Sequence, residues 1–370
     1  MKIKHLAYLI SLATSLPAVP VFIGTNTGEQ TTSKGIYLAD FDPANGKLTE
    51  PKLAADYQEP GFLALHPSLP VLLCIGSPKT PFQDGTNSVA AFSIGENNVL
   101  TFLGETSSGG KGACHLDIDP AGTTVAVANY SDGNIATIRL DAKGIPTSAV
   151  TIIRNQGSGL NPTRQQSPHA HGVYFNRLGT HLFVPDLGID KVLIYPFDAA
   201  TSKLGAPLPC LTTAPGAGPR HMAFSTDEKN AYIINELDNT VLTALHEDGA
   251  LKPLATLTTL PVGFSANNST AEIEVSADNR FVYASNRGHD SIAVFSRNTE
   301  NGTLTSLQIA PCGGKAPRHF KISPDGKWLL CAHMESHTIS VLPRNPQTGE
   351  LGSPICTVPS PSPICLTFSR

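Results

Sequence analysis

The sequence has no run of lysine and arginine residues, and its 370 residues carry a formal net charge of −4. Nucleic acids and anionic membrane surfaces attract clustered positive charge, so we expect neither as a partner. The sequence also lacks any Cys-x-x-Cys pair. That absence argues against a zinc knuckle and against a thioredoxin-type redox motif.

Several catalytic motifs are missing as well. No Gly-x-Ser-x-Gly elbow for a serine nucleophile occurs, so we expect water to be the attacking group in any hydrolysis. The glycine-rich segment 104–112 does not fit a phosphate-binding P-loop, because Glu105 stands where the first glycine is needed. No stretch of a dozen residues follows the helical period. Short apolar runs separated by Pro, Asp, Gly and Asn predict β-strands instead.

The N-terminus differs from the rest of the chain. A basic start is followed by an apolar run, residues 6–16, that is too short to span a bilayer. Residues 1–18 therefore resemble a secretory signal peptide, although Leu16 stands where a small residue is preferred. Cleavage would place the protein in the periplasm or outside the cell, and the alternative is an N-terminal extension on a cytoplasmic protein.

The chain contains seven cysteines, an odd number that leaves at least one unpaired in an exported protein. Cys74, Cys331 and Cys365 stand in apolar strand-like runs. A cysteine in such a setting behaves as a small hydrophobic residue. The cysteines therefore do not decide the compartment.

One motif is repeated along the chain. A polar pair leads into a short strand, a turn follows, and a second apolar strand ends in a polar residue, most clearly in residues 218–237 and 316–335. The last strand residue before each turn is, in chain order, His66, Asp119, Asn176, Ser225, Ala277 and Ser323. The steps between them run from 46 to 57 residues. This period, with four short strands per unit, is typical of β-propeller blades.

A seventh copy, residues 366–369, stops at the end of the sequence. Its missing partner strands stand at the other end, beginning with residues 21–25. The sequence therefore predicts an all-β fold, a seven-bladed β-propeller closed by pairing of the N- and C-terminal strands. Closure of the ring hides strand edges that would otherwise be exposed. Since each unit needs its neighbours, we expect residues 19–370 to form one domain.

The repeat also predicts where polar side chains gather. The first two strands of a unit are joined by a tight turn and run antiparallel, so the start of the first and the end of the second share one face of the disc. Before the first strands stand His115, His169, His171, Arg220, His221, Glu272, Arg318 and His319. After the second strands stand Asn129, Tyr130, Asp186, Glu236, Asn286, Arg287, His289, His333 and Glu335. We expect these side chains to surround one mouth of the central channel.

Such a cluster suits an anionic substrate with a carbonyl centre. Arginine binds carboxylate or phosphate through two parallel donors, and histidine is a general base near neutral pH. Arg220 and Glu236 belong to neighbouring strands of one unit, with His171 one unit earlier and Arg287 one unit later. The longest irregular segment, residues 153–168, ends just before the His171 strand, and loops of that length are usually functional or mobile.

Plainer interpretations exist for the same residues. Arg220 and Glu236 could form only a structural ion pair. His169 and His171 point the same way on a strand and could bind a metal, but the spacing specifies no third ligand, and we expect neither a metal nor a cofactor at the site. His115 and His319 could do no more than tie blades together by hydrogen bonds.

The sequence resembles a known family. The resemblance is carried by Gly218-Pro219-Arg220-His221, Ser285-Asn286-Arg287-Gly288, Pro168-His169-Ala170-His171, Asn235-Glu236-Leu237, Cys114-His115-Leu116 and Ala128-Asn129-Tyr130. These runs are similar to those of the seven-bladed propeller lactonases, whose named members are the bacterial propeller-type 6-phosphogluconolactonase and the fungal carboxy-cis,cis-muconate cyclase. The likeness extends from residue 21 to the end of the chain.

The resemblance implies a metal-independent lactone enzyme. By motif, the His, two Arg and Glu proposed to act in the cyclase branch match His171, Arg220, Arg287 and Glu236. The chain departs from the family at Asn26, where a tyrosine usually follows Gly-Thr. That position is expected near the mouth, so this departure bears on which substrate binds there.

Together these observations predict hydrolysis of a sugar δ-lactone, 6-phosphogluconolactone by preference, by a monomer that takes a small-molecule substrate. In this hypothesis His171 activates water, Arg220 or Arg287 stabilises the oxyanion, and Glu236 orients Arg220. The residues expected to bind substrate are His169, His221, Glu272, Arg318, His319 and Asn129.

Three alternatives remain open at the level of sequence. Phosphogluconolactone is a cytoplasmic intermediate, so a cleaved signal peptide would favour an unphosphorylated or different lactone. A muconate-type cyclase is the second enzyme class. A propeller that only binds ligands or partners is the non-enzyme alternative, since one fold hosts many functions.

Overall fold

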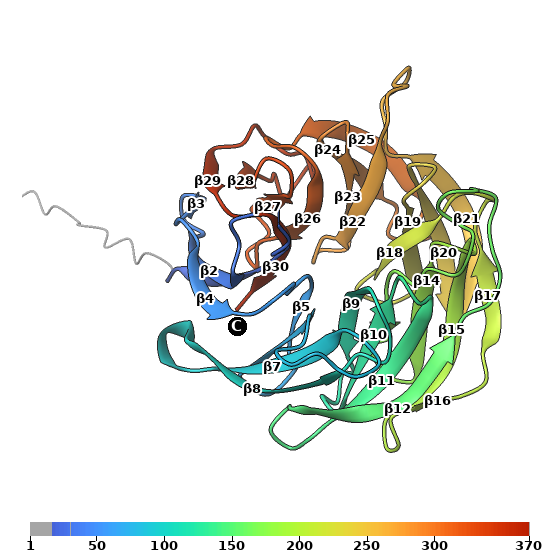
Figure 1. Ribbon diagram of the computed structural model, residues 1–370. Helices are drawn as coiled ribbons and strands as arrows, with labels where there is room; N and C mark the ends of the chain where they lie inside the picture. The colour runs from blue at the N-terminus through green and yellow to red at the C-terminus, as the bar shows by residue number, and fades with distance from the viewer. Residues whose placement is uncertain (1–16, 30, 370) are drawn as a thin grey trace, which may run out of the picture.

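The computed structural model describes residues 17–29 and 31–369, which form seven antiparallel sheets arranged as blades around a central axis (Figure 1). The predicted all-β propeller with seven blades is confirmed. The predicted signal peptide lies outside the described residues except for Pro17 and Ala18. Among the described residues, no helix has the length and apolarity that a membrane crossing needs.

We number the blades in chain order. Blade 1 contains β1 (Val19–Thr25), β2 (Gly35–Asp42), β3 (Lys47–Leu48), β4 (Lys52–Asp56) and β30 (Pro363–Phe368). Blade 2 contains β5 (Leu63–Leu65), β6 (Val71–Gly76), β7 (Ser88–Ile94) and β8 (Leu100–Ser107). Blade 3 contains β9 (Ala113–Ile118), β10 (Thr124–Asn129), β11 (Asn134–Leu140) and β12 (Pro146–Arg154). Blade 4 contains β13 (Tyr174–Phe175), β14 (His181–Asp186), β15 (Lys191–Asp198), β16 (Lys203–Leu204) and β17 (Leu208–Thr212).

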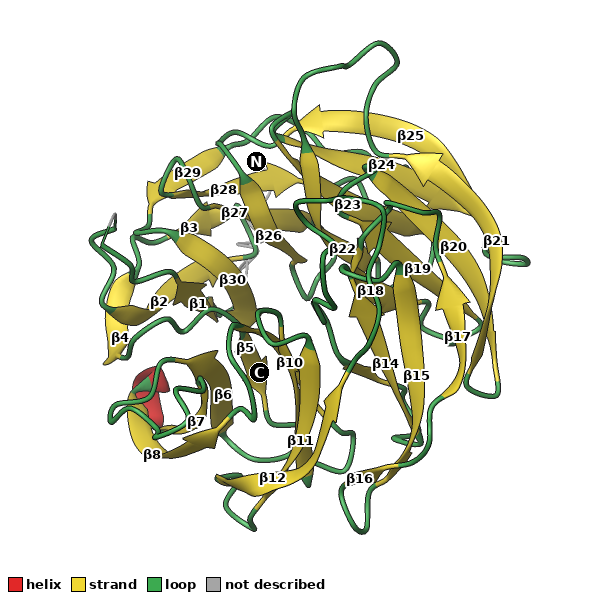
Figure 2. Ribbon diagram, turned by 45° about the vertical axis from the view of Figure 1, so that its right-hand side comes forward, coloured by secondary structure: helices red, strands yellow, loops and turns green. Residues whose placement is uncertain are grey.

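The remaining blades have four strands each. Blade 5 contains β18 (Pro219–Phe224), β19 (Asn230–Asn235), β20 (Thr240–Glu247) and β21 (Ala250–Thr258). Blade 6 contains β22 (Ser269–Val275), β23 (Phe281–Arg287), β24 (Ser291–Arg297) and β25 (Leu304–Pro311). Blade 7 contains β26 (Pro317–Ile322), β27 (Trp328–His333), β28 (Thr338–Pro343) and β29 (Cys356–Pro359). A short 3₁₀ turn, η1 (Glu96–Asn98), is the one helical element of the described chain (Figure 2).

The two ends of the chain close the ring. The last strand, β30, pairs antiparallel with β1, with Val21 opposite Phe368 and Ile23 opposite Leu366. Blade 1 therefore has the strand order β3-β2-β1-β30, with the final strand of the chain in the innermost position. The predicted closure by the terminal strands is confirmed. The innermost strands of the seven blades are β30, β5, β9, β13, β18, β22 and β26, and Figure 1 shows those that it labels around the central axis.

The turn between the two inner strands explains why the repeat is visible in the sequence. In six blades the backbone amide of the residue after the first strand bonds to the carbonyl five residues later; these residues are His66, Asp119, Asn176, Ser225, Ser276 and Ser323. Their side chains accept or donate further bonds in the same turn, as Ser225 does to Asn230. Five of the six positions are those predicted, and in blade 6 the residue is Ser276 rather than Ala277, because Ser276 caps the turn.

The apolar core lies between the faces of neighbouring blades. One cluster joins blades 6 and 7 and includes Phe281, Tyr283, Phe320 and Leu329, all buried. Similar clusters join blades 2 and 3 and blades 7 and 1. Each blade thus buries both of its faces against its neighbours. The apolar core is therefore complete only when all seven blades are in place.

Tyrosine–arginine hydrogen bonds lock blades 5, 6 and 7 together. The hydroxyl of Tyr232 on β19 accepts a 2.6 Å bond from Nε of Arg297 on β24. One blade on, the hydroxyl of Tyr283 accepts a 2.6 Å bond from Nε of Arg344 and donates a 2.7 Å bond to the carbonyl of Gly349. Both arginines are buried, so the tyrosine oxygens satisfy charged donors that water does not reach.

Substitution Tyr283→Phe should therefore lower the free energy of unfolding by about 1–3 kcal/mol, because it leaves a buried guanidinium donor and a buried carbonyl unpaired. Urea unfolding followed by fluorescence measures the change. The matched control is Tyr37→Phe, whose hydroxyl accepts a 3.3 Å bond from the backbone of Lys34 in an exposed segment. Equal unfolding midpoints for the two variants would contradict a structural role for the lock.

Candidate active site

The mouth of the channel is shaped by irregular pairing at the start of the inner strands. In the described chain, five inner strands change register against their second strands at this point: β30, β9, β18, β22 and β26. In four of them the extra residue is Ile364, Cys114, Arg220 or Arg318. A β-bulge re-aims the side chain of its extra residue, and all four of these residues line the cavity described next.

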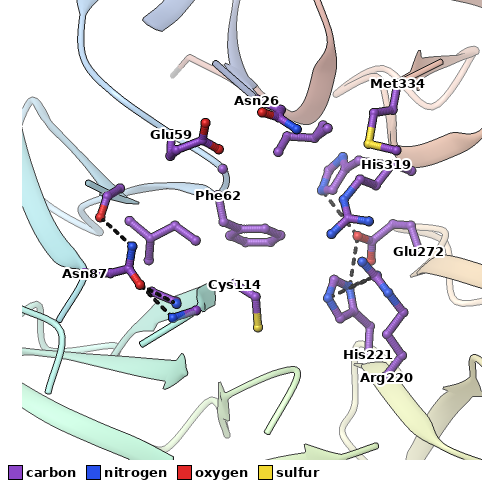
Figure 3. Close-up of a pocket in the computed structure, with 17 residues that line it drawn as sticks. Asn26, Glu59, Phe62, Asn87, Cys114, Arg220, His221, Glu272, His319 and Met334 are labelled. Carbon is purple, nitrogen blue, oxygen red and sulfur yellow. Dashed lines mark hydrogen bonds and ion pairs between the residues drawn. The ribbon is translucent and has the colours of Figure 1, made fainter. Parts of the chain in front are cut away.

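The cavity at this mouth has a volume of about 370 Å³, within the size range of small-molecule sites. Its wall includes Asn26, Glu59, Phe62, Cys114, Arg220, His221, Glu272, Arg318, His319, Met334 and Ile364. These residues come from blades 1, 2, 3, 5, 6 and 7, so the ring geometry brings distant parts of the sequence to one opening (Figure 3). The predicted convergence at one mouth holds for Arg220, His221, Glu272, Arg318 and His319.

Glu236, directly after β19, is the centre of the charged cluster. Its Oε2 lies 3.1 Å from Nε of Arg220, 3.0 Å from a terminal nitrogen of Arg287 and 3.8 Å from Nε2 of His171. Its Oε1 accepts a 2.7 Å hydrogen bond from Arg164. The structure therefore brings together the four residues predicted to be catalytic and adds a fifth.

The electrostatics of this cluster are dominated by the arginines. Burial by itself would raise the pKa of the Glu236 carboxyl, but the charges of Arg287 and Arg220 outweigh it and hold the pKa far below its usual range. Burial, together with Arg220, lowers the pKa of His171 well below its ordinary value, while Glu236 opposes the shift. At neutral pH the carboxylate is therefore ionised and the His171 imidazole is neutral.

The floor of the cavity is a group of imidazoles around Phe62. The Phe62 ring centroid lies 4.1 Å from that of His115, 5.8 Å from His319 and 6.1 Å from His221. Figure 3 shows the Phe62 ring in the middle of the cavity, with His221, Glu272 and His319 on the facing side. Burial is the main reason that the pKa falls to about 3 for His115 and to about 4 for His319.

Hydrogen bonds fix where the protons of these rings lie. Nδ1 of His319 accepts the backbone amide of Leu366 at 3.3 Å, so a neutral ring carries its proton on Nε2, which faces Glu272 Oε2 at 3.4 Å. His221 directs Nδ1 to the same Glu272 oxygen at 3.1 Å. Glu272 is thus an acceptor shared by two imidazoles, and it orients both rings at the cavity wall.

Arg318 differs from the other arginines of the mouth. Among the described residues it has no hydrogen-bond or ion-pair partner, although its side chain lines the cavity. Burial, with Arg220 and Arg287 nearby, lowers the pKa of its guanidinium to about 9. Its charge is therefore uncompensated, and an anion in the cavity would relieve that cost.

Two of the predicted substrate-binding residues do not reach the cavity. Asn129 is fully buried and donates a 2.9 Å bond to the carbonyl of Ser108, which ties blade 3 to the end of β8. His169 stacks on Tyr130 with ring centroids 4.4 Å apart, and its Nδ1 lies 2.9 Å from the Tyr130 carbonyl oxygen. Both residues stand at the predicted end of the blade, but contacts with backbone carbonyl oxygens hold their side chains away from the opening.

His169 and His171 also do not form a metal site, since no acidic, cysteine or further histidine ligand joins them in a group within the described residues. His171 itself lies behind the lining, with Nδ1 3.9 Å from the Cys114 sulfur, and its side chain retains 7% exposure. It is next to the cavity rather than in its wall.

Sequence reasoning missed Arg164, Phe62 and Cys114. Arg164 belongs to the irregular segment 153–168, whose length indicated function, but no repeat marks the residue inside it. Cys114 stands before the predicted blade 3 strand and could have been found from its equivalence to Arg220 and Arg318. Asn26 does line the cavity, as its place after Gly-Thr led us to expect.

Comparison with known proteins gives consistent results. The family model described as "Lactonase, 7-bladed beta-propeller" matches residues 20–368. The 6-phosphogluconolactonase of Bacillus subtilis is 35% identical over 285 residues, covering 76% of this chain and 78% of the relative. A 6-phosphogluconolactonase of Formosa agariphila is 31% identical, with 76% and 80% covered.

Among solved structures, the periplasmic gluconolactonase of Pseudomonas aeruginosa superposes with a TM-score of 0.89. It is 30% identical, and the match covers 95% of this chain and 99% of that one. The likeness therefore spans the whole ring, including the blades that supply the cavity.

The buried imidazoles predict how stability depends on pH. A histidine whose pKa is about 4 when folded and about 6.5 when unfolded binds a proton only in the unfolded state between those values, so stability falls as the pH falls through that window. For His319 the full effect is roughly 3 kcal/mol. Asp117, whose pKa burial raises to about 6, acts in the opposite sense. The informative quantity is therefore the difference between wild type and His319→Gln.

We expect the unfolding midpoint of wild type to drop more steeply than that of His319→Gln between pH 6.5 and pH 4, measured by thermal melts in a series of buffers. His115→Gln should flatten the profile in the same direction, since the pKa of His115 is lowered by the same cause. Parallel profiles for all three proteins would show that these rings are not held neutral by the fold.

Proposed function

This chain belongs to the seven-bladed β-propeller lactonase family, and on that premise we propose that it hydrolyses a sugar δ-lactone, 6-phospho-D-glucono-1,5-lactone, to 6-phosphogluconate. The observation that carries the proposal is the cavity wall, where Arg220 and Arg318 line a space of small-molecule size and Arg220 shares the buried carboxylate of Glu236 with Arg287. The relatives named 6-phosphogluconolactonase support the same substrate.

The reaction needs three things from the protein. Water must lose a proton as it attacks the lactone carbonyl, the resulting oxyanion must be stabilised, and the ring oxygen must gain a proton when its bond to the carbonyl carbon breaks. A general base is worth roughly 10²–10⁴ in rate, and one oxyanion donor about 10²–10³. The cluster around Glu236 contains candidates for each role.

His171 is our candidate for the base. It is neutral at pH 7 because burial lowers its pKa, so its lone pair can accept a proton from water. The imidazolium that forms would face the ionised Glu236 carboxylate at 3.8 Å, which stabilises it. The same proton can then pass to the leaving ring oxygen.

Arg220 and Arg287 are the candidates for the oxyanion donor. Both lie within 3.1 Å of Glu236 Oε2, and each also donates to a backbone carbonyl of blade 6, Arg220 to Ala271 and Arg287 to Thr270. Glu236 and these carbonyls hold the guanidiniums in place before substrate arrives, which is the condition for electrostatic stabilisation of a transition state.

Arg318 is the candidate for the phosphate. Its guanidinium has no partner among the described residues, and a phosphate would provide one with two parallel hydrogen bonds. His319, next in sequence, lines the same wall. We expect a monomer that needs no metal or cofactor for this reaction and that binds neither nucleic acid nor membrane.

A second imidazole lines the cavity directly. His221 is oriented by Glu272 at 3.1 Å, an arrangement of base and orienting group that also supports proton transfer. Lactone opening above the spontaneous rate should therefore be compared for His171→Ala, His221→Ala and Arg220→Ala. We expect a loss of about 10²-fold or more in kcat for His171→Ala and Arg220→Ala. Full activity of His171→Ala with inactive His221→Ala would reassign the base to His221.

The role of Arg318 gives a separate prediction. Arg318→Met should raise KM for the phosphorylated lactone by roughly 10–100-fold, the worth of charged hydrogen bonds, and should change KM for glucono-1,5-lactone much less. The control is Lys321→Met on the same strand. The Lys321 ammonium lies 3.3 Å from a carboxylate oxygen of Glu274, and neither residue lines the cavity. An equal effect of Arg318→Met on both lactones would mean that Arg318 does not bind the phosphate.

One comparison favours a second candidate, an exported enzyme for an unphosphorylated lactone. The Pseudomonas aeruginosa structure is that of a periplasmic gluconolactonase, and residues 1–18 read as a signal peptide. Sequencing the N-terminus of the mature protein and measuring kcat/KM for both lactones tests this choice. A chain that starts near residue 19 and prefers gluconolactone would establish the second candidate, whereas an intact N-terminus with preference for the phosphorylated lactone would establish the first.

A further inference from the structure

A cluster of two thiols and an imidazole lies between blades 6 and 7, apart from the cavity wall. Cys312 follows β25, and Cys331 and His333 belong to β27. Their two sulfurs and one ring nitrogen all lie within 4.8 Å of one another, and all three residues are fully buried. The proposed lactone chemistry uses none of them, and within the described chain no other group of three His, Cys, Asp or Glu residues is so close.

The spacing of the three atoms fits a bound metal. The Cys312 sulfur lies 3.9 Å from Nδ1 of His333. A zinc ion about 2.3 Å from sulfur and about 2.1 Å from nitrogen separates two tetrahedral ligands by roughly 3.6 Å. The observed separation is close to that value, so an ion fits between the ligands with small side-chain movements.

The histidine is also oriented as a metal ligand. Ser340 on β28 donates its hydroxyl proton to the carbonyl of Cys312 at 2.6 Å, so its oxygen must accept at 2.8 Å from Nε2–H of His333. That bond places the ring proton on Nε2 and leaves the lone pair of Nδ1 facing the sulfur. Metal-bound histidines are characteristically held through their second nitrogen in this way.

The loop before β26 closes the cluster from one side. A Cβ atom at Gly314 would come within 2.4 Å of the His333 ring, so the loop backbone lies directly against the imidazole. The carbonyl oxygen of Gly314 is 3.7 Å from the Cys312 sulfur. This oxygen, beside the Cys312 sulfur, is our candidate for the fourth ligand.

We propose that Cys312, Cys331 and His333 form a structural zinc site. Two thiolates and one Zn²⁺ sum to zero charge, which suits a fully buried site among apolar residues such as Phe320 and Leu329. Binding releases the two thiol protons to solvent as the two sulfur–zinc bonds form. Thiolate and imidazole together are ligands that select zinc over magnesium or calcium.

The site would fasten the loop that leads into the catalytic wall. Cys312 lies six residues before Arg318, and the loop between them is held to β27 and β28 by the Ser340 bond and by contacts of Gly314. A metal that joins Cys312 to β27 would fix the start of β26 relative to blade 7. We therefore assign it a stabilising role rather than a catalytic one.

The test uses the full chain, purified in metal-free buffer after expression with added zinc, and measures metal content by mass spectrometry. We expect about one zinc per chain in wild type and less than about one tenth of that in Cys331→Ala and Cys312→Ala. Cys74→Ala is the matched control, since Cys74 is an equally buried cysteine in blade 2, and it should retain full zinc content.

A second measurement does not depend on the variants folding. Wild-type protein stripped of metal and titrated with Co²⁺ should develop an intense thiolate-to-cobalt charge-transfer band that saturates at about one equivalent and disappears on addition of Zn²⁺. Zinc should also raise the thermal midpoint of the stripped protein by roughly 5 °C.

Two results would overturn the proposal. One is wild-type protein with no bound zinc and no cobalt charge-transfer band, since both read the site without any substitution. The other is a Cys312–Cys331 disulfide found in non-reduced peptides of protein that excludes zinc, which would show that the two thiols cross-link blades 6 and 7 instead.

Discussion

A single buried carboxylate holds the mouth of this propeller together. Glu236 contacts guanidiniums from blades 5 and 6 and from the loop before blade 4, and an imidazole from blade 4 lies beside them. One negative charge cannot balance three neighbouring cations, and Arg318 adds a fourth with no partner among the described residues. The cluster around Glu236 therefore retains excess positive charge. That imbalance is the physical reason for expecting an anionic ligand.

The ring and its β-bulges determine where these charged side chains lie. Antiparallel inner hairpins place the beginning of one strand and the end of the next on one face, and the extra residue at each bulge is directed toward the opening. Arg220 and Arg318 occupy equivalent bulge positions two blades apart. The same local irregularity thus supplies one arginine that pairs with Glu236 and one that does not. The two roles that we propose, transition-state stabilisation by Arg220 and substrate binding by Arg318, thus use one repeated backbone feature.

The repeat made most of this predictable from sequence. Blade number, ring closure and the meeting of His171, Arg220, Glu236 and Arg287 followed from period and strand direction. Period alone could not tell which of two adjacent side chains faces the opening, because a bulge shifts the alternation by one residue. Asn129 was misplaced for another reason, because its side-chain amide donates to the carbonyl of Ser108 instead of facing the opening. Arg164 was missed because the irregular segment that carries it has no counterpart in other blades.

The spacing of cysteine and histidine residues along the sequence did not predict the thiol cluster, for a related reason. Its ligands come from a loop of one blade and a strand of the next, so no short Cys-x-x-Cys pair announces them. Only Cys331 and His333 are close in sequence. Cys331 was interpreted as a member of an apolar strand, and His333 was expected at the mouth of the channel, whereas the structure buries it beside Cys312. Contacts within a hairpin produce a regular pattern in the sequence, whereas contacts between blades do not.

Ring closure has a consequence for partly folded forms of the chain. Asn26 follows β1 and Ile364 belongs to β30, and both line the cavity. Because β1 and β30 pair with each other to complete blade 1, the cavity wall is assembled only when the two ends of the ring have met. An intermediate in which the other six blades have formed therefore still lacks part of the wall that receives the substrate.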